Sequence, residues 1–254
     1  MCGIFLLLNH SLDSTDSTDS INQYNDVNNL FMKGRNRGPE NSKLEIIDNN
    51  TIFGFHRLAI NGLNDESNQP LCINDCILIC NGEIYNHKNL YDIIKVNPST
   101  NSDCEIIIHM YLKYGIDQTL IMLDGVFAFA LYDTKKNLLF VARDPYGVRS
   151  LLVQQVRHMN NFFEILKIEY SFSSEMKCFY NQKKTNILSD NNNITHSVIY
   201  QFEPGFVCKF NRKNNNIWGL NYKKQYHICN FSYNIFDYNL TNKEMFLPNI
   251  SKYL

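Results

Sequence analysis

Short apolar runs separated by turn residues recur along this chain, and they constrain its fold more than any other feature. The runs are rich in Val, Ile, Leu and Phe, a composition typical of β-strands. We expect strands at residues 4–8, 51–60, 77–80, 126–133, 138–143, 164–172 and 199–210. The Lys and Asn residues at 135–137 predict a turn that joins two of these strands into a hairpin. Strands therefore outnumber helices, and their order predicts an α+β fold with two sheets and helices packed outside them.

One helix and two irregular segments complete the predicted organisation. Ser102 and Glu105 form an S-x-x-E capping box, and apolar residues follow at helical spacing, so we expect a helix over residues 102–114. Residues 9–29 are polar and repetitive, which predicts a flexible loop. Residues 211–254 are rich in Asn, Lys and Tyr and lack clear periodicity. We therefore expect one domain over residues 1–210 and a linker or C-terminal arm over residues 211–254.

Composition and charge exclude several classes of function. The net charge of −1 gives no electrostatic reason to bind nucleic acid or an anionic membrane, and no apolar run approaches the length of a membrane span. The eight cysteines, in a chain without an export signal, predict reduced thiols and a cytoplasmic location. No Cys-x-x-Cys pair or neighbouring histidine completes a zinc site, so we expect no metal.

The second residue, Cys2, is the first candidate for chemistry. Initiator methionine is usually removed when the next side chain is small, which would leave the thiol of Cys2 beside a free α-amine. An amine with a pKa of about 7.7–8.0 beside a thiol with a pKa of about 8.5 makes a nucleophile with its own base. A chance Met-Cys start is the alternative, unless residues further along support the chemistry.

Three further positions could complete a site around such a nucleophile. Asn81-Gly82 follows a predicted strand, and its amide and backbone N–H could form an oxyanion hole, although Asn-Gly is also the strongest short turn signal. Arg57 lies within an apolar strand and either faces solvent or captures a carboxylate. Asp103 at the start of the predicted helix is explained by the helix dipole, or else it holds an ammonium group.

Taken together, the motifs of this chain resemble the glutaminase domain of asparagine synthetases, a class II glutamine amidotransferase of the N-terminal nucleophile hydrolase superfamily. The resemblance covers residues 2–205 and continues weakly near Tyr226-His227. The strand sequence His56-Arg57-Leu58 separates this branch from the glucosamine-phosphate synthase branch. The motifs that carry the resemblance occur in order: Met1-Cys2-Gly3-Ile4-Phe5, Arg37-Gly38-Pro39, residues 53–60, Gln69-Pro70, Asn81-Gly82-Glu83-Ile84-Tyr85-Asn86-His87, Asp103-Cys104-Glu105, residues 122–129, 143–149 and 174–177, and Pro204-Gly205.

The resemblance implies a four-layer αββα sandwich with two largely antiparallel sheets, and it implies roles for the candidate residues. Cys2 would attack the side-chain amide of L-glutamine, with its own amine moving the proton to ammonia. The oxyanion would be held by Asn81 and the Gly82 N–H. The same resemblance assigns the α-carboxylate of the substrate to Arg57, with the backbone of Ile60 nearby, and the α-ammonium to Asp103 and Glu83. Neither metal nor cofactor is needed for this half-reaction.

Departures from the family pattern are few, with one large absence. Asn36 and Glu40 replace the His and Asp usually found on either side of Arg37-Gly38-Pro39, and Asn61 replaces a small or apolar residue. The phosphate loop of the ATP-dependent synthetase domain does not occur, so we expect that ATP and Mg²⁺ belong to a domain outside this sequence. An active glutaminase that supplies ammonia to a separately encoded synthetase subunit is the favoured hypothesis. A truncated remnant and a non-catalytic module that binds glutamine or a partner stay as alternatives.

Overall fold

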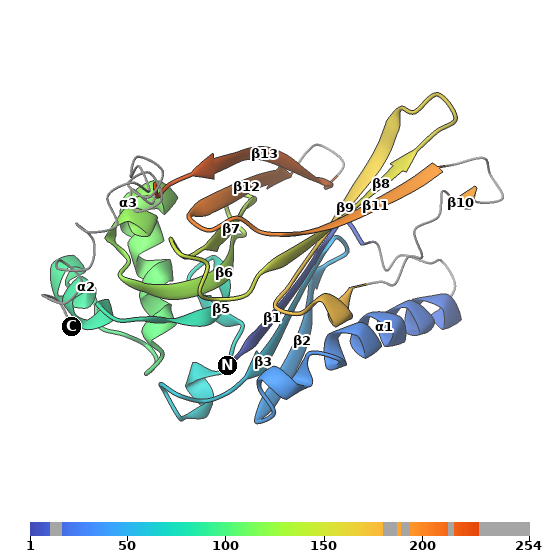
Figure 1. Ribbon diagram of the computed structural model, residues 1–254. Coiled ribbons are helices and arrows are strands. Elements are labelled where there is room, and N and C mark those ends of the chain that lie inside the picture. The colour runs from blue at the N-terminus through green and yellow to red at the C-terminus, as the bar shows by residue number, and fades with distance from the viewer. Residues whose placement is uncertain (11–16, 180–186, 189–193, 213–215, 229–254) are drawn as a thin grey trace, which may run out of the picture.

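The computed structural model describes residues 1–10, 17–179, 187–188, 194–212 and 216–228, and its strands form two antiparallel sheets (Figure 1). The first sheet has seven strands, in the order β10 (Ile187–Leu188), β11 (Ile194–Gln201), β8 (Leu152–Met159), β9 (Ile165–Ser173), β1 (Gly3–Leu8), β3 (Thr51–Arg57) and β2 (Asn41–Asp48). The second has six, in the order β13 (Trp218–Gln225), β12 (Phe206–Arg212), β7 (Leu138–Arg143), β6 (Gly125–Asp133), β5 (Cys76–Ile84) and β4 (Leu71–Ile73).

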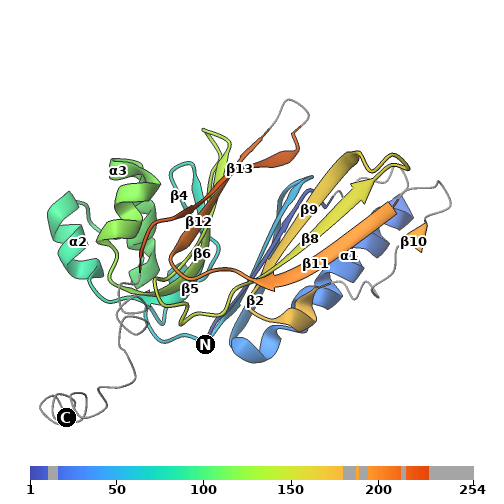
Figure 2. The same cartoon turned by 45° about the horizontal axis from the view of Figure 1, so that its top comes forward.

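Helices cover the outer faces of both sheets and produce four layers, as Figure 2 shows. Helix α1 (Ser17–Met32) lies on the first sheet, whereas α2 (His87–Ile94) and α3 (Ile106–Met122) lie on the second. Ile4, Leu6 and Leu8 of β1 pack between the sheets. Phe5 and Leu7 point the other way, toward α1. The αββα sandwich and its two antiparallel sheets are therefore confirmed.

The first apolar run of the chain becomes a central strand. β1 pairs with β3 on one side and β9 on the other, and every residue from Gly3 to Leu8 is buried. A strand buried on both faces needs apolar residues at every position, which explains its unbroken apolar sequence. This placement fixes Cys2 at the mouth of the sandwich, where the N-terminus lies between the two sheets (Figure 2).

The prediction of a flexible loop over residues 9–29 is wrong for residues 17–29, which belong to α1. The helix packs through Val27, Leu30 and Phe31, all buried, against Phe5 and Leu7 of β1. Its apolar residues gather near its C-terminal end, so the polar stretch before them concealed the helix. Residues 11–16 lie outside the described part of the chain.

The helix predicted over residues 102–114 exists, but its capping box does not form. Asp103–Glu105 is a 3-10 turn, and Ser102 makes no side-chain capping hydrogen bond. The Glu105 carboxylate instead accepts hydrogen bonds from the Ser99 and Thr100 N–H groups, at 2.7 and 2.6 Å. Helix α3 begins at Ile106 and runs to Met122, with a break at Gly115, where φ is +77°.

The second sheet continues beyond residue 210, where the domain was predicted to end. The predicted strand 199–210 is two strands, β11 and β12, and β13 then pairs with β12 as far as Gln225. Trp218 of β13 is buried, and its indole N–H donates to Thr51 Oγ1 at 2.8 Å. The rest of the predicted arm, from residue 229 onward, lies outside the described residues.

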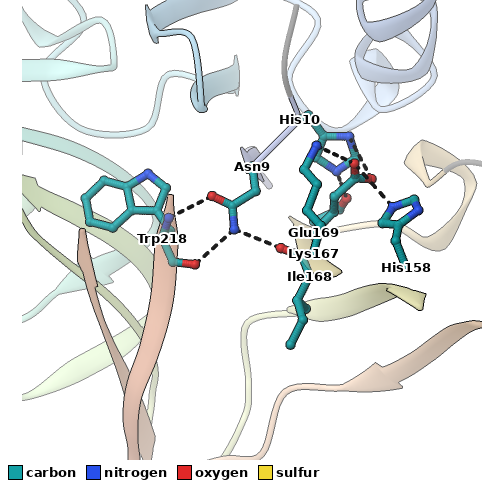
Figure 3. A network of polar contacts seen from close by, with 8 residues as sticks. Asn9, His10, His158, Lys167, Ile168, Glu169 and Trp218 are labelled. Carbon is teal, nitrogen blue, oxygen red and sulfur yellow. Dashed lines mark hydrogen bonds and ion pairs between the residues drawn. The ribbon is translucent and has the colours of Figure 1, made fainter. Parts of the chain in front are cut away.

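Asn9, directly after β1, ties the two sheets together at the end opposite Cys2 (Figure 3). Its side-chain amide donates to the carbonyl oxygens of Ile168, at 2.8 Å, and Trp218, at 2.9 Å. Its Oδ1 accepts from the Trp218 N–H at 2.8 Å. The side chain therefore links β9 of the first sheet to β13 of the second. No described helix is long and apolar enough to cross a membrane.

Candidate active site

One pocket collects nearly all of the residues that the sequence nominated. It opens at the N-terminal end of β1, where β3, β5 and the 3-10 turn before α3 converge. Every predicted site residue except Asn81 lines it, and Asn81 is buried in β5 between two lining residues. The lining comprises Cys2, Phe55, Arg57, Leu58, Ile60, Asn61, Ser67, Gln69, Cys80, Gly82, Glu83, Ser102, Asp103 and Cys104.

Cys2 is half-buried and held in place by backbone contacts. Its Sγ lies 3.4 Å from both the N and the O of Leu58, and its carbonyl oxygen accepts from Arg37 Nε at 2.8 Å. Burial raises the pKa of the Cys2 thiol, although the hydrogen bond to the Leu58 backbone and the positive charge of the Met1 amine act in the opposite direction. A thiol with a raised pKa is protonated at neutral pH, so nucleophilic attack requires a base.

Asn81 and Gly82 lie inside β5, so the hairpin-turn interpretation of this dipeptide is wrong. They pair with Ala128 and Phe127 of β6. The Phe127 carbonyl oxygen accepts a hydrogen bond from the Asp144 N–H, so the backbone groups of Phe127 face away from β5. Gly82 and Phe127 are therefore a non-hydrogen-bonded pair of the antiparallel ladder. The Gly82 N–H is therefore directed away from β6, toward the open edge of β5 beyond the end of β4.

Only glycine fits at position 82. A Cβ there would lie 2.7 Å from the Val126 carbonyl oxygen and 2.8 Å from Phe127 Cβ. From the Gly82 carbonyl onward, side chains cover the open edge of β5: the Cys104 thiol faces the Gly82 carbonyl at 3.9 Å, and Asp103 Oδ2 accepts from the Ile84 N–H at 2.6 Å. The Gly82 N–H thus lies at the pocket wall as a backbone donor.

Asn81 supplies a second donor. The residue is only 1% exposed, and its Nδ2 is buried without a hydrogen-bond partner among the described residues. A buried amide nitrogen without an acceptor costs about 1–3 kcal/mol. An acceptor bound beside it would remove that cost, as expected of an oxyanion hole.

Arg57 faces the interior, so the solvent-facing alternative is wrong. It is 7% exposed, and its guanidinium donates to the carbonyl of Gly62, to Asn64 O at 3.1 Å and to Asn68 Oδ1 at 2.5 Å. These acceptors are all neutral. A buried cation with only neutral partners in the described chain is suited to an incoming carboxylate.

Asp103 is also more than a helix-dipole residue. It is 5% exposed, and its Oδ2 accepts a hydrogen bond from the Ile84 N–H. This hydrogen bond holds the carboxylate at the pocket wall. Glu83 of β5 is half-buried, and Ile60 is exposed; both line the same pocket. The pocket therefore presents a cation from one sheet and carboxylates from the other side, the arrangement that an amino-acid zwitterion requires.

Residues that depart from the family pattern are accommodated at the rim. Glu40 Oε2 accepts from the Ala59 N–H at 2.5 Å and so supports the segment after β3. Asn61 lines the pocket. Glu40 therefore contributes a loop contact, and Asn61 is placed where it can touch a ligand.

Some motif residues prove to be structural. Asn86 donates through Nδ2 to Met122 O at 2.8 Å and accepts from the Asp124 N–H at 3.1 Å, which joins α2 to the start of β6. The Asp144 carboxylate accepts from the N–H groups of Tyr146, Val148 and Arg149 and shapes the turn after β7.

Gln69 was missed as a site residue, although it stands in a motif. It is buried, lines the pocket and bonds to the backbone of Cys80. The only sequence signal was its position before Pro70 in the Gln-Pro motif, which does not reveal the partner. No group of three or more His, Cys, Asp or Glu side chains in the described ranges could hold a metal ion.

Comparison with known proteins finds a related family and related sequences. The family model described as "Glutamine amidotransferase domain" matches residues 1–219. Curated proteins named "Asparagine synthetase [glutamine-hydrolyzing]" match over 129 residues, at 46% identity in Mesocricetus auratus and 44% in Homo sapiens, covering 47% of this chain and 22% of each relative. The aligned region therefore covers less than a quarter of the length of these relatives.

Solved structures support the fold. A glutamine phosphoribosylpyrophosphate amidotransferase from B. subtilis, complexed with ADP and GMP, superposes with a TM-score of 0.59 at 19% identity. A second structure, titled as the allosteric regulatory enzyme of purine biosynthesis, gives 0.57 at 19% identity. Each match covers 90% of this chain and 50% of the other.

Proposed function

This chain belongs to the glutamine amidotransferase domain family, and we propose that it hydrolyses L-glutamine to glutamate and ammonia with Cys2 as the nucleophile. One observation carries the proposal. The Cys2 thiol shares a pocket with the buried Arg57 guanidinium and the buried Asp103 carboxylate. These opposite charges match the α-carboxylate and α-ammonium of an amino acid, and they leave its side chain free to reach the thiol.

Substrate binding follows from the charges around the pocket. Arg57 binds the α-carboxylate through the N–H groups that its loop partners leave free, and the backbone near Ile60 closes that side. Asp103 and Glu83 receive the α-ammonium. The side-chain amide then extends toward Cys2 and the open edge of β5, where it meets the donors of Asn81 and Gly82.

The chemistry needs a base, because burial raises the pKa of the thiol. Removal of Met1 converts the Cys2 nitrogen from an amide into an amine that takes the thiol proton. The thiolate attacks the amide carbon, and the oxyanion is held by the Gly82 N–H and Asn81 Nδ2. The ammonium of Cys2 then protonates the amide nitrogen of the tetrahedral intermediate, so that the C–N bond breaks and ammonia leaves. Water hydrolyses the remaining thioester to glutamate and the free Cys2 thiol.

The released ammonia also has a proposed destination. The curated relatives are named glutamine-hydrolysing asparagine synthetases. We propose that ammonia released here passes to an ATP-dependent synthetase unit, which would hold the ATP and Mg²⁺. The hydrolytic half itself uses the side chains and backbone groups of the pocket, without a metal or cofactor.

Product analysis tests the proposed function. The purified chain, with its N-terminal mass determined, is incubated with L-glutamine or with L-asparagine, and glutamate, aspartate and ammonia are quantified. We expect glutamate and ammonia in equal amounts from glutamine, and no aspartate from asparagine. Ammonia without glutamate, or equal hydrolysis of both amides, contradicts the proposal.

A further inference from the structure

The strand beside β5 ends before it reaches the proposed oxyanion donors. β4 pairs with β5 through Leu71 with Leu78, Cys72 with Ile77 and Ile73 with Cys76. Continued in the same register, the ladder would place Gln69 opposite Cys80. The structure contains no such backbone pair, because β4 begins only at Leu71.

The side chain of Gln69 replaces the missing backbone pair. Its Oε1 accepts from the Cys80 N–H at 2.6 Å, and its Nε2 donates to the Cys80 carbonyl at 3.1 Å. A primary amide carries the same donor and acceptor as a peptide group, so both edge-facing groups of Cys80 are satisfied. The side chain is buried, with 6% of the residue exposed, which shields both hydrogen bonds from water.

Two side chains therefore anchor the open edge of β5 on either side of Gly82. Gln69 holds the peptide groups of Cys80, and Asp103 holds the Ile84 N–H. Asn81 follows Cys80 directly, so the position of its side chain depends on the orientation of the Cys80 peptide. A displacement of about 1 Å at a reacting centre costs about 100-fold in rate.

We propose that Gln69 is a positioning residue that aims the Asn81 side chain and the Gly82 N–H at the transition-state oxyanion. The inference rests on the proposed function, which assigns the oxyanion to these two donors. Gln69 does not contact the reacting atoms in this account. It acts through the Cys80 peptide and completes, with one side chain, the sheet edge that forms the oxyanion hole.

The test compares Gln69→Ala with the wild-type chain, with Gln154→Ala as the matched control. Gln154 is a glutamine that is 1% exposed in β8 of the other sheet, where its amide donates to Ser197 Oγ at 3.1 Å. Both variants lose a buried amide. We expect Gln69→Ala to lower kcat by about 10–100-fold with KM within about twofold, because the oxyanion forms only in the transition state. The control should keep kcat within about twofold.

Two further readouts separate positioning from loss of fold. Alkylation of Cys2 by iodoacetamide develops no oxyanion, so its rate should be unchanged in Gln69→Ala. In Gln69→Glu, a protonated carboxyl group offers Cys80 one donor and one acceptor. The ionised carboxylate has no proton to donate, and the Cys80 carbonyl oxygen repels it. The kcat of that variant relative to wild type should therefore rise as the pH falls toward its carboxyl pKa, while the ratio for Gln69→Ala stays flat.

Each outcome has a distinct meaning. A Gln69→Ala chain with wild-type kcat overturns the positioning role, as does a fall in kcat matched by Gln154→Ala or accompanied by an equal loss of Cys2 alkylation. A wild-type chain without glutamate release overturns the proposed function, and the positioning role with it. A selective fall in kcat, with pH-dependent recovery in Gln69→Glu, establishes the role.

Discussion

The side-chain nitrogen of Asn81 has no hydrogen-bond partner among the described residues, which predicts that its removal lowers activity strongly and leaves stability nearly unchanged. In Asn81→Ala, one oxyanion donor is lost, which typically lowers kcat by about 10²–10³-fold, or about 3–4 kcal/mol of transition-state stabilisation. The same change removes a buried Nδ2 without a hydrogen-bond partner in the described chain, and such a group costs about 1–3 kcal/mol in the folded state.

The cavity left by the truncation acts against that gain, so the free energy of unfolding should change by less than about 1 kcal/mol. In a protein of this size, 1 kcal/mol corresponds to about 2–4 °C in Tm. We therefore expect a Tm within about 4 °C of wild type, together with the large fall in kcat. Steady-state glutamate release and thermal unfolding measure the two quantities on the same preparation.

Asn9→Ala is the matched control, because Asn9 is an equally buried asparagine whose amide is fully used (Figure 3). Its φ of +65° is also unfavourable for alanine. Loss of these hydrogen bonds should lower the free energy of unfolding by about 3 kcal/mol or more, with kcat of the folded fraction nearly unchanged. If Asn81→Ala instead loses stability like Asn9→Ala and keeps its kcat, the oxyanion assignment is refuted.

Two other residues give predictions with different readouts. Arg57→Ala should raise KM for glutamine by about 10–100-fold with little change in kcat, because a carboxylate contact contributes equally to ground and transition states; a fall in kcat alone would show that Arg57 has another role. Burial opposes ionisation of Glu105, but hydrogen bonds from His109, Ser99 and Thr100 outweigh it and lower its pKa to about 2. Because this folded-state pKa is below that of the unfolded chain, about 3 kcal/mol of stability is present above pH 4.5 and is lost as the pH falls toward 2. Unfolding of Glu105→Gln should lack this portion of the acid dependence, and an unchanged pH profile would contradict the prediction.

Alternation and turn residues predicted much of the fold. The hairpin of β6 and β7 was found because its apolar residues alternate and a Lys-Lys-Asn turn separates them. Helix α1 was missed because few of its residues are apolar and the buried ones, such as Phe31, lie near its end. The prediction of a Ser102–Glu105 capping box was wrong because the Glu105 carboxylate accepts hydrogen bonds from the Ser99 and Thr100 N–H groups instead.

The site shows a similar limit. Residue types at Cys2, Arg57 and Asp103 suggested their chemistry, and the pocket brings these residues together. The local sequence Asn81-Gly82 favoured a turn, whereas in the structure both residues pair with β6 as part of a strand. The role of Gln69 depends on where β4 ends and which way the Cys80 peptide faces, and neither follows from a sequence pattern.

The most direct test of the central claim is glutamate release from L-glutamine by the wild-type chain and by Cys2→Ala, with removal of Met1 verified by mass. We expect turnover by the wild-type chain that begins at Cys2, and none by the variant, with both chains equally folded. Undiminished glutamate release by Cys2→Ala, or full activity in a chain that keeps Met1, would contradict it.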